Sequence, residues 1–348
     1  MKKGTSIRLK LLCAVLGLLL TSSLCLAQGK AGPWPPHRQM GVQSQATIQG
    51  DQTRAAVALN YTFTIVNFPG APETVAYGIN PSGTPSALHM AGANGAVGSD
   101  GYGSGFLLQM TNARGIFSET LQTVNFPTGT GQQANSTNDP GQIVGTYFDG
   151  LGTEHGYELS NGSYTTIDAP FQGVTYTVAY GINNTGTIVG CFGQAGNDGH
   201  GFVLSRGNYV QLDFPGDGIL GTCANGINNQ GDIVGWYDDA ANVTHGFLLR
   251  GGTYTSLDPP GSTSTAAGGI NDGGEIVGYY CLTSACSQNA LDGAQGFLLS
   301  KGNFANIDAP DASGTLSFGI SNNNVIVGWY TDCAGLYHSF IATLPGTP

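Results

Sequence analysis

The hydrophobic positions of this chain fall in short runs separated by turns rich in Gly and Asn, and the arrangement repeats from Tyr61 to the C-terminus. The period is about 45 residues, a length typical of propeller blades and similar arrays. The clearest copy spans residues 222–260 and contains the apolar runs 233–234 and 247–249. Runs this short, bounded by Gly and Asn, predict β-strands rather than helices.

Three features recur in every copy. The first is a Val-Gly pair, whose glycines are Gly98, Gly145, Gly190, Gly235, Gly278 and Gly328. The second is an aromatic residue after a small one, at Phe106, Tyr157, Phe202, Phe247, Phe297 and Phe340. The third is an Asp/Asn-x-Pro motif, which starts at Asn67, Asn125, Asp168, Asp213, Asp258 and Asp308. Six occurrences of each feature indicate six structural units.

Each unit is predicted to contain four short strands. In the clearest copy the strands are expected over residues 222–228, 232–237, 245–250 and 253–258. The turns at 229–231 and 251–252 contain the Asn and Gly residues that tight hairpins need for positive φ. The strands are apolar on successive residues, so both faces of each sheet must be buried. Sheets stacked face to face satisfy that requirement.

The two ends of the chain favour a closed ring over an open stack. The first recognisable strand, residues 61–68, matches the fourth strand of a unit. The last, residues 338–344, matches the third strand of a unit. The C-terminal unit therefore lacks the strand that the N-terminus carries in excess. An open solenoid would instead need polar caps at its ends. We predict an all-β, six-bladed β-propeller of four-stranded blades, closed by an N-terminal strand that joins the C-terminal blade.

The repeat itself resembles a known group of sequences. Residues 227–235, Ile-Asn-Asn-x-Gly-x-Ile-Val-Gly, followed by His-Gly-Phe at 245–247, are similar to the HAF-repeat family of extracellular bacterial proteins. The resemblance covers nearly all of residues 61–348 and implies an extracellular location, but it carries over no catalytic residues. The first unit departs from the pattern at residues 81–85, and the second has Asn-Ser-Thr-Asn at 135–138 in place of Gly-Ile-Asn.

The N-terminus has the features of a secretory signal. Four basic residues precede the apolar run 11–20, and small residues before position 28 suit cleavage after Ala27. The run is short for a membrane span, which needs about 20 apolar residues. We therefore predict a signal peptide at 1–27, a flexible linker at 28–60 and the propeller at 61–348. The mature protein would be secreted, extracellular or periplasmic, with no insertion into the membrane.

The charge of the chain excludes two classes of partner. The net charge is −11 and only 9% of the residues are charged. An acidic surface repels nucleic acid, and it offers no basic patch for anionic lipids. The chain has no Walker loop, Rossmann glycine motif, HExxH or GxSxG sequence. We therefore expect no cofactor.

Five cysteines remain after cleavage of the predicted signal. Cys281 and Cys286 share one loop and can pair locally, while Cys191 and Cys223 are expected at the same side of adjacent blades. An exported chain can form both disulfides. The pairing of Cys333 stays open, since Cys281 or Cys286 of the neighbouring blade is an alternative partner for it.

Two repeated polar positions suggest chemistry but favour a structural interpretation. One position holds His155, His200, His245 and His338, and the other holds Asp168, Asp213, Asp258 and Asp308. Three or four His could bind zinc, and a carboxylate pair could hydrolyse a glycoside. Equivalent His residues lie one blade apart, however, which is too far for a shared ion unless they point into the axis. An Asp beside a Pro at a strand end more often caps a turn. We predict a His–Asp hydrogen bond within each blade, no metal site and no catalytic residue.

Trp236, Trp329 and Tyr279 follow the Gly of the Ile-Val-Gly motif and are the candidate binding residues. They could stack on sugars, and the alternative is packing between blades. Variable loops on one face are the expected place for binding. We predict a non-catalytic module for an extracellular glycan or protein.

Two other functions stay open. One is a polysaccharide lyase or hydrolase with its site at the central channel, and the other is a structural envelope protein. Singular polar residues at the channel mouth would favour the enzyme. A channel lined by repeated small residues, such as Gly226 and Gly268, would favour the binding module.

Overall fold

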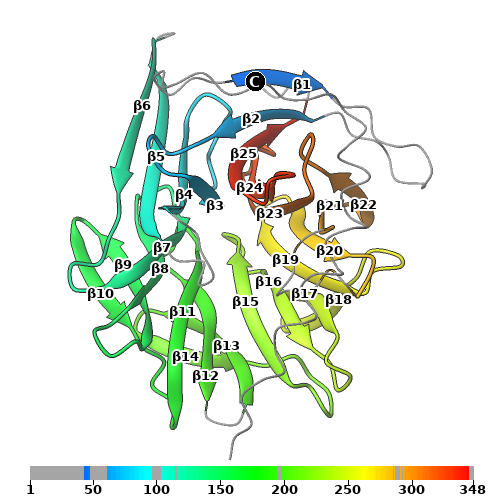
Figure 1. Cartoon of the computed structure of the whole chain (residues 1–348). Helices are drawn as coiled ribbons and strands as arrows, with labels where there is room; N and C mark the ends of the chain where they lie inside the picture. Colours follow the sequence, from blue (N-terminus) through cyan, green and yellow to red (C-terminus); the bar gives the residue numbers. More distant parts are fainter. Residues whose placement is uncertain are drawn as a thin grey trace, which may run out of the picture. The chain divides into compact units, whose positions relative to one another are not determined.

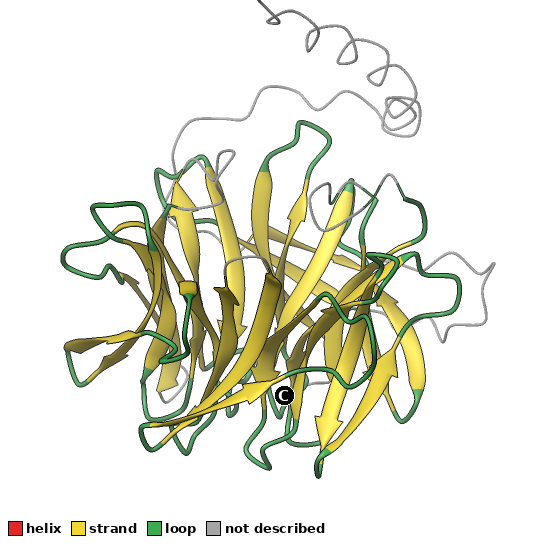
Figure 2. Cartoon of the chain, turned by 90° about the horizontal axis from the view of Figure 1, so that it is seen from below, coloured by secondary structure: helices red, strands yellow, loops and turns green. Residues whose placement is uncertain are grey.

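The computed structural model describes residues 43–47 and 61–344 except 96–102, 114–115, 195–196, 285, 287–290 and 292. The chain divides into two units, Met1–Gln39 and Met40–Pro348, and all the described residues belong to the second. The predicted signal peptide lies outside them. The described secondary structure consists of strands joined by loops (Figure 2). No helix in these ranges has the length and hydrophobicity to cross a membrane.

Six antiparallel sheets form the blades of a six-bladed propeller (Figure 1). Blades 1 and 2 contain β3 (Glu73–Ile79), β4 (Leu88–Gly95), β5 (Ser104–Ala113), β6 (Ile116–Thr123), β7 (Thr130–Thr137), β8 (Ile143–Phe148), β9 (Glu154–Ser160) and β10 (Ser163–Ile167). Blades 3 and 4 contain β11 (Val174–Ile182), β12 (Ile188–Gln194), β13 (Asn197–Ser205), β14 (Asn208–Leu212), β15 (Gly221–Ile227), β16 (Ile233–Asp238), β17 (Thr244–Arg250) and β18 (Thr253–Leu257). Blade 5 contains β19 (Ser264–Ile270), β20 (Ile276–Cys281), β21 (Gln295–Ser300) and β22 (Asn303–Ile307).

Blade 6 combines the two ends of the chain, as predicted. Its strands are β23 (Gly314–Ile320), β24 (Ile326–Thr331), β25 (Tyr337–Thr343) and β2 (Thr62–Val66). β2 pairs with β25 in antiparallel register, from Thr62 opposite Thr343 to Val66 opposite Ser339. A further strand, β1 (Gln43–Thr47), pairs with the outer edge of β2 and makes this sheet five-stranded. The predicted linker at 28–60 therefore contains a strand.

The first strand of each blade (β3, β7, β11, β15, β19 and β23) is the inner strand. Each inner strand contacts the inner strand of both neighbouring blades, and the last contacts the first, so the ring is closed. The sheets bury both faces between blades because their middle strands are apolar on consecutive residues, as Ile233 and Val234 are. Both are buried against the neighbouring sheets.

In five blades a glycine of the second strand lies beneath the buried aromatic ring of the third strand, and in blade 4 Gly235 pairs in register with Phe247. A Cβ on Gly235 would collide with the carbonyl oxygen of Cys223, so no larger residue fits there. In blade 1 the glycine in this place is Gly92, beneath Phe106. The sequence pattern placed Gly98 in this series of glycines, and Gly98 lies outside the described residues. The structure has Gly92 in the equivalent register with β3, which the sequence did not reveal because Met90-Ala91-Gly92 does not resemble Ile-Val-Gly.

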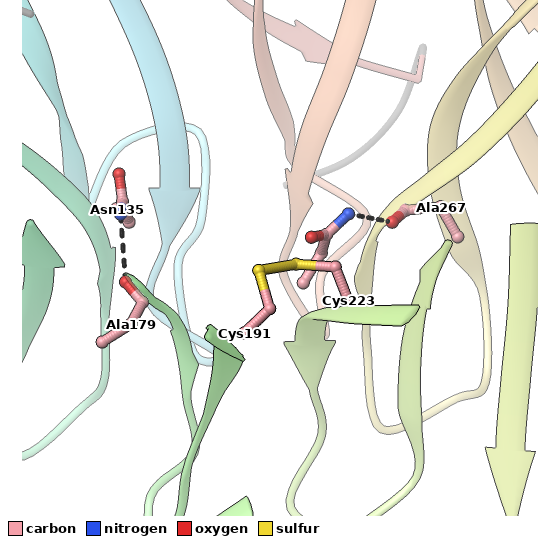
Figure 3. The surroundings of a disulfide bond; sticks show 6 residues. Asn135, Ala179, Cys191, Cys223 and Ala267 are labelled. Atoms are coloured by element: carbon pink, nitrogen blue, oxygen red, sulfur yellow. Dashed lines mark hydrogen bonds between the residues drawn. A yellow bond between two sulfur atoms is a disulfide. The ribbon is translucent and has the colours of Figure 1, made fainter. Parts of the chain in front are cut away.

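Both predicted disulfides are present. Cys191 on β12 is bonded to Cys223 on β15, which ties blade 3 to blade 4 (Figure 3). Cys281, at the end of β20, is bonded to Cys286 five residues later. Because Cys281 and Cys286 bond to each other, neither is the partner of Cys333.

Amide side chains also join neighbouring blades, at the residue that follows the inner strand in blades 2, 3, 4 and 5. The amide nitrogen of Asn183 donates to the backbone carbonyl of Asn228 at 3.0 Å, and Asn228 donates in the same way to Asn271 at 3.1 Å. The same bond runs from Asn138 to Asn183 and from Asn271 to Ser321. These asparagines are buried, so the bonds replace those that water would otherwise make. This ladder explains the recurrent Ile-Asn motif, which the sequence alone left without a role.

Candidate binding site in the central channel

The six inner strands enclose a cavity of about 610 Å³ along the axis of the ring. Pockets that hold small ligands commonly measure about 300–1,000 Å³. Residues of all six inner strands line it, together with Trp236 and Tyr279 from the second strands of blades 4 and 5. Asp272 and Asn322, which follow β19 and β23, border it at the turn side.

Each inner strand contains a β-bulge, and the bulge residue faces the cavity. The pairing register between first and second strand shifts by one residue at the same place in all six blades. The extra residues are Tyr77, Asn135, Tyr180, Asn225, Gly268 and Phe318, and all of them line the cavity. Bulges redirect a side chain out of the regular alternation. The fold therefore repeats this position six times, but the residue placed there changes from blade to blade.

The residue after the bulge lets the blades approach one another. It is Gly in five blades and Ser136 in blade 2. A Cβ on Gly181 would lie 2.8 Å from the backbone carbonyl of Asn225 in the next blade. The repeated glycine thus serves the packing of the ring, and the bulge residue before it is left to set the chemistry of the channel.

Aromatic rings form a continuous wall on one side of the cavity. The Phe318 ring centre lies 5.5 Å from that of Tyr77, edge to face, and 5.9 Å from that of Tyr279. These separations are typical of interacting aromatic pairs. We call these three residues the aromatic wall. Trp236 also lines the cavity, and its side chain is half-buried.

Trp329 does not belong to the lining. Its residue is only 7% exposed, and its ring stacks behind Phe318 at 6.3 Å and contacts Tyr337 edge to face. It is part of the buried cluster between blades 6 and 1 that includes Val75. Of the three predicted aromatic candidates, Trp236 and Tyr279 reach the cavity. For Trp329 the structure shows the alternative, packing between blades.

Asparagine side chains occupy two of the bulges. The amide nitrogen of Asn135 donates to the carbonyl of Ala179 in blade 3 at 3.0 Å (Figure 3), and Asn225 donates to Ala267 in blade 5 at 2.9 Å. Asn135 is 3% exposed, and its Oδ1 has no hydrogen-bond partner among the described residues. The sequence indicated only that residues 135–138 depart from the repeat. It did not identify either asparagine as a channel residue.

Three tyrosine hydroxyls in the lining stay protonated. Burial raises the pKa of Tyr279 to about 12 and raises the pKa of Tyr77 still further. The pKa of Tyr180 is also raised, mainly by burial and in addition by nearby groups that include Tyr77 and Tyr279. Each hydroxyl is therefore a neutral group that can donate or accept a hydrogen bond.

One carboxylate, Asp272, is present among the described residues that line the cavity. It accepts hydrogen bonds from the backbone N–H and the amide of Asn229, both at 2.8 Å, and from the amide of Asn322 at 2.7 Å. Glycoside hydrolysis by two carboxyls needs both groups about 5–10 Å apart across one bond. The described lining supplies one carboxylate, Asp272, and this carboxylate already accepts hydrogen bonds from residues of the neighbouring blades.

The predicted His–Asp contacts occur in three blades and lie away from the cavity. In blades 2 and 3 the Nδ1 atom of His lies 2.7 Å from the Asp carboxylate, in the pairs His155–Asp168 and His200–Asp213. In blade 4 the distance is 3.0 Å, in the pair His245–Asp258. In blade 5 Gln295 takes the His position, so Asp308 has no His partner of this kind. In blade 6 the fourth strand is β2, and His338 contacts the loop residue Asp332 instead, at 3.0 Å.

A second aspartate holds the histidine from the loop side in two of these blades. Asp149 accepts backbone N–H bonds from Leu151 and Thr153, and its other oxygen lies 3.4 Å from His155 Nε2. Burial alone would lower the pKa of His155, but the hydrogen bonds and charges of Asp168 and Asp149 outweigh it and raise the pKa. No described group of three His, Cys, Asp or Glu side chains is placed to hold a metal ion.

Comparisons with known proteins identify the fold only. No family model matches the chain, and no curated protein matches it. Among solved structures, a sialidase from Trypanosoma rangeli is 8% identical, with a TM-score of 0.50, over 88% of this chain and 59% of its own. A mutant of AofleA from Arthrobotrys oligospora is 12% identical, with a TM-score of 0.48, over 81% and 86%. A fucose-specific lectin from Aleuria aurantia is 12% identical, with a TM-score of 0.44, over 79% and 98%.

Proposed function

We propose that this protein is a secreted, non-catalytic propeller that binds a glycan in its central channel. The observation that carries the proposal is the lining of the cavity, which combines an aromatic wall with amide and hydroxyl groups. A sugar ring has apolar C–H faces and a rim of hydroxyls, so it needs both kinds of contact at once. Small-ligand pockets generally have mostly apolar walls with a few fixed polar groups.

The proposal places the site in the channel rather than on the loop-rich face. The sequence favoured the variable loops because they depart from the repeat, and part of the longest loop, 281–294, lies outside the described residues. Within the described residues, the bulge positions depart from the repeat while the backbone around them is constant. Polar and aromatic side chains on such a rigid frame are well suited to fixed recognition.

Two other functions have less support. The unlike polar residues of the channel meet the condition that the sequence analysis set for an enzyme rather than the one for a binding module. A hydrolase, however, would also need a second carboxylate beside Asp272, and the described lining has none. The similarity to the sialidase is a similarity of fold, and one fold serves many functions. A purely structural role gives no account of a cavity of ligand size with unlike residues at its six equivalent positions. The two disulfides support secretion, because disulfides persist in oxidising compartments, and the predicted signal peptide at 1–27 agrees with it.

A glycan array probed with the purified protein tests the proposal. We expect selective binding, and we expect Trp236→Ala to weaken it about 30-fold, since truncating a buried aromatic contact typically costs roughly 2 kcal/mol. Leu151→Ala is the matched control, because Leu151 is an exposed side chain in the β8–β9 loop. Loss of binding in the Leu151 variant alone would place the site on the loop face. Release of products from a polysaccharide would show that the protein is an enzyme.

A further inference from the structure

Blade 2 contains a buried hydrogen-bond acceptor to which no described residue donates. The amide nitrogen of Asn135 is engaged by the carbonyl of Ala179, so the side chain cannot flip, and Oδ1 is the atom left over. This oxygen is buried and has no partner among the described residues. Buried polar atoms nearly always have a partner. Ten described residues have such an unpaired buried atom, and Asn135 is the one among them that lines the cavity, where a ligand could supply the missing donor.

The other bulge asparagine of the channel, Asn225, differs from Asn135 in the burial of its side-chain oxygen. Asn225 makes the same inter-blade bond to Ala267, but it is half-buried, so its oxygen can be hydrated. At the equivalent position the other blades have Tyr77, Tyr180, Phe318 and Gly268. Asn135 is thus the one bulge residue with a fixed, dehydrated acceptor among those described.

Asn135 also adjoins the aromatic wall. Its backbone carbonyl lies so near Gly78 that a Cβ there would approach it to 2.6 Å, and Gly78 directly follows Tyr77. A ring stacked on the wall would present its rim to this edge of the channel. A hydroxyl on that rim is a donor of suitable size for the oxygen.

The charges of the lining define which sugars fit. No Lys, Arg or His is among the described residues that line the cavity, and Asp272 is its one charged side chain. The chain as a whole has a net charge of −11. A sugar carboxylate would lose its hydration here without gaining a cationic partner, and an unpaired buried charge is strongly unfavourable.

We infer that the channel selects an uncharged sugar and that Asn135 Oδ1 orients it by accepting a hydrogen bond from one sugar hydroxyl. The inference rests on the proposed function and adds the ligand class and a residue that determines specificity.

Isothermal titration of the purified protein with methyl glycosides tests the choice of sugar. The neutral probes are the methyl glycosides of glucose, galactose, mannose and fucose, and the acidic probes are methyl glucuronide and methyl galacturonide. We expect at least one neutral glycoside to bind and the acidic probes to bind at least tenfold more weakly. Equal affinity for the uronide of the same sugar would overturn the inference while leaving glycan binding intact.

Monodeoxy forms of the sugar that binds test the role of Asn135. Removal of one particular hydroxyl should weaken binding to the wild type about tenfold. The Asn135→Ala variant should bind the parent sugar about tenfold more weakly than the wild type does. This variant should bind the deoxy sugar no worse than the parent sugar. Asn135→Gly repeats the measurement with a residue that the ring already accommodates as Gly268.

The control separates recognition from loosening of the ring. Asn183→Ala also removes an inter-blade bond from an amide to a carbonyl, but Asn183 does not line the cavity. The affinity of the Asn183→Ala variant for the sugar should stay within about twofold of the wild-type value. If sugars bind and the Asn135 variants bind them as well as the wild type, the role of Asn135 is refuted. If neither the glycosides nor the array shows any binding, the proposed function itself fails.

Discussion

Among the described residues, the side-chain hydroxyl of Thr265 has no hydrogen-bond partner, because residue 259 is proline. Thr265 is fully buried on β19, and its Oγ1 is unsatisfied among the described residues. In four other blades the equivalent threonine accepts a backbone N–H at 2.9–3.1 Å, in the pairs Phe68–Thr74, Ala169–Thr177, Phe214–Thr222 and Ala309–Thr315. Pro259 has no N–H to donate. The same residue type therefore stabilises four blades and leaves an unpaired polar group in the fifth.

This difference predicts opposite outcomes for one substitution. Thr222→Val should lower the free energy of unfolding by about 1–3 kcal/mol, because it leaves the N–H of Phe214 without an acceptor. Thr265→Val removes a hydroxyl that has no partner, so its effect should be near zero or stabilising. Urea unfolding of the two variants measures both values. Equal losses would show that Thr265 has a partner in solution.

The contacts of His155 predict a pH-dependent contribution to stability. Because its pKa is raised in the folded protein, the contribution is complete below the ordinary pKa of about 6.5 and is lost as the pH rises through the folded-state value. His155→Gln, which copies Gln295 of blade 5, should therefore cost more stability at pH 5.5 than at pH 9. The difference should stay below about 1 kcal/mol, since Asp168 is half-exposed. Chemical unfolding at both pH values measures it, and an equal cost at each would contradict the ion-pair interpretation.

The two disulfides should differ in their effect. The Cys191–Cys223 bond closes a segment 32 residues long, while Cys281–Cys286 closes one of 5. Stabilisation by a cross-link grows with the length of the loop it closes, so loss of the first should cost roughly 3–4 kcal/mol and loss of the second about 2 kcal/mol. Thermal unfolding of the two double Cys→Ser variants tests the order. A larger loss for the short loop would mean that native packing, rather than loop length, determines the effect.

The register of blade 1 has its own test. Gly92→Ala forces a methyl group between the Val75 carbonyl and the Phe106 ring, so we expect a loss of about 1–3 kcal/mol or more, as at Gly235. Gly98→Ala is the comparison that the sequence pattern suggests. Unfolding curves in which Gly98→Ala is the more damaging change would overturn the register described for β3 and β4.

The blade count and the ring closure were accessible from the sequence because they depend on what repeats. Glycines under aromatic rings, turn residues and the split final unit leave periodic marks. The strand β1 was missed because a lone outer strand belongs to no repeat. The sequence pattern misaligned blade 1 because the side chains of Met90-Ala91-Gly92 fit the space that Ile-Val-Gly fills in other blades but are of different residue types.

The candidate site was less accessible because it depends on what does not repeat. A bulge in each inner strand changes which side chain faces the channel, and the bulge has no residue signature of its own. Trp236 and Trp329 occupy one sequence position and differ in environment. The next inner strand presents Ala266 and Gly268 in one case, and Val75 and Tyr77 in the other. The small pair leaves room for Trp236 to reach the cavity, while the large pair packs against Trp329.

The pairing of β2 with β25 has a consequence for the order of events during synthesis. β2 is made before the strands of the other five blades, yet its partner β25 is made after all of them. Until then both β2 and the unfinished sixth blade expose strand edges, which readily pair with other chains. A chain that stops early can complete five blades but cannot close the ring. Closure thus distinguishes molecules that contain β25 from those that stop before it, and molecules that remain open would be the ones most prone to associate.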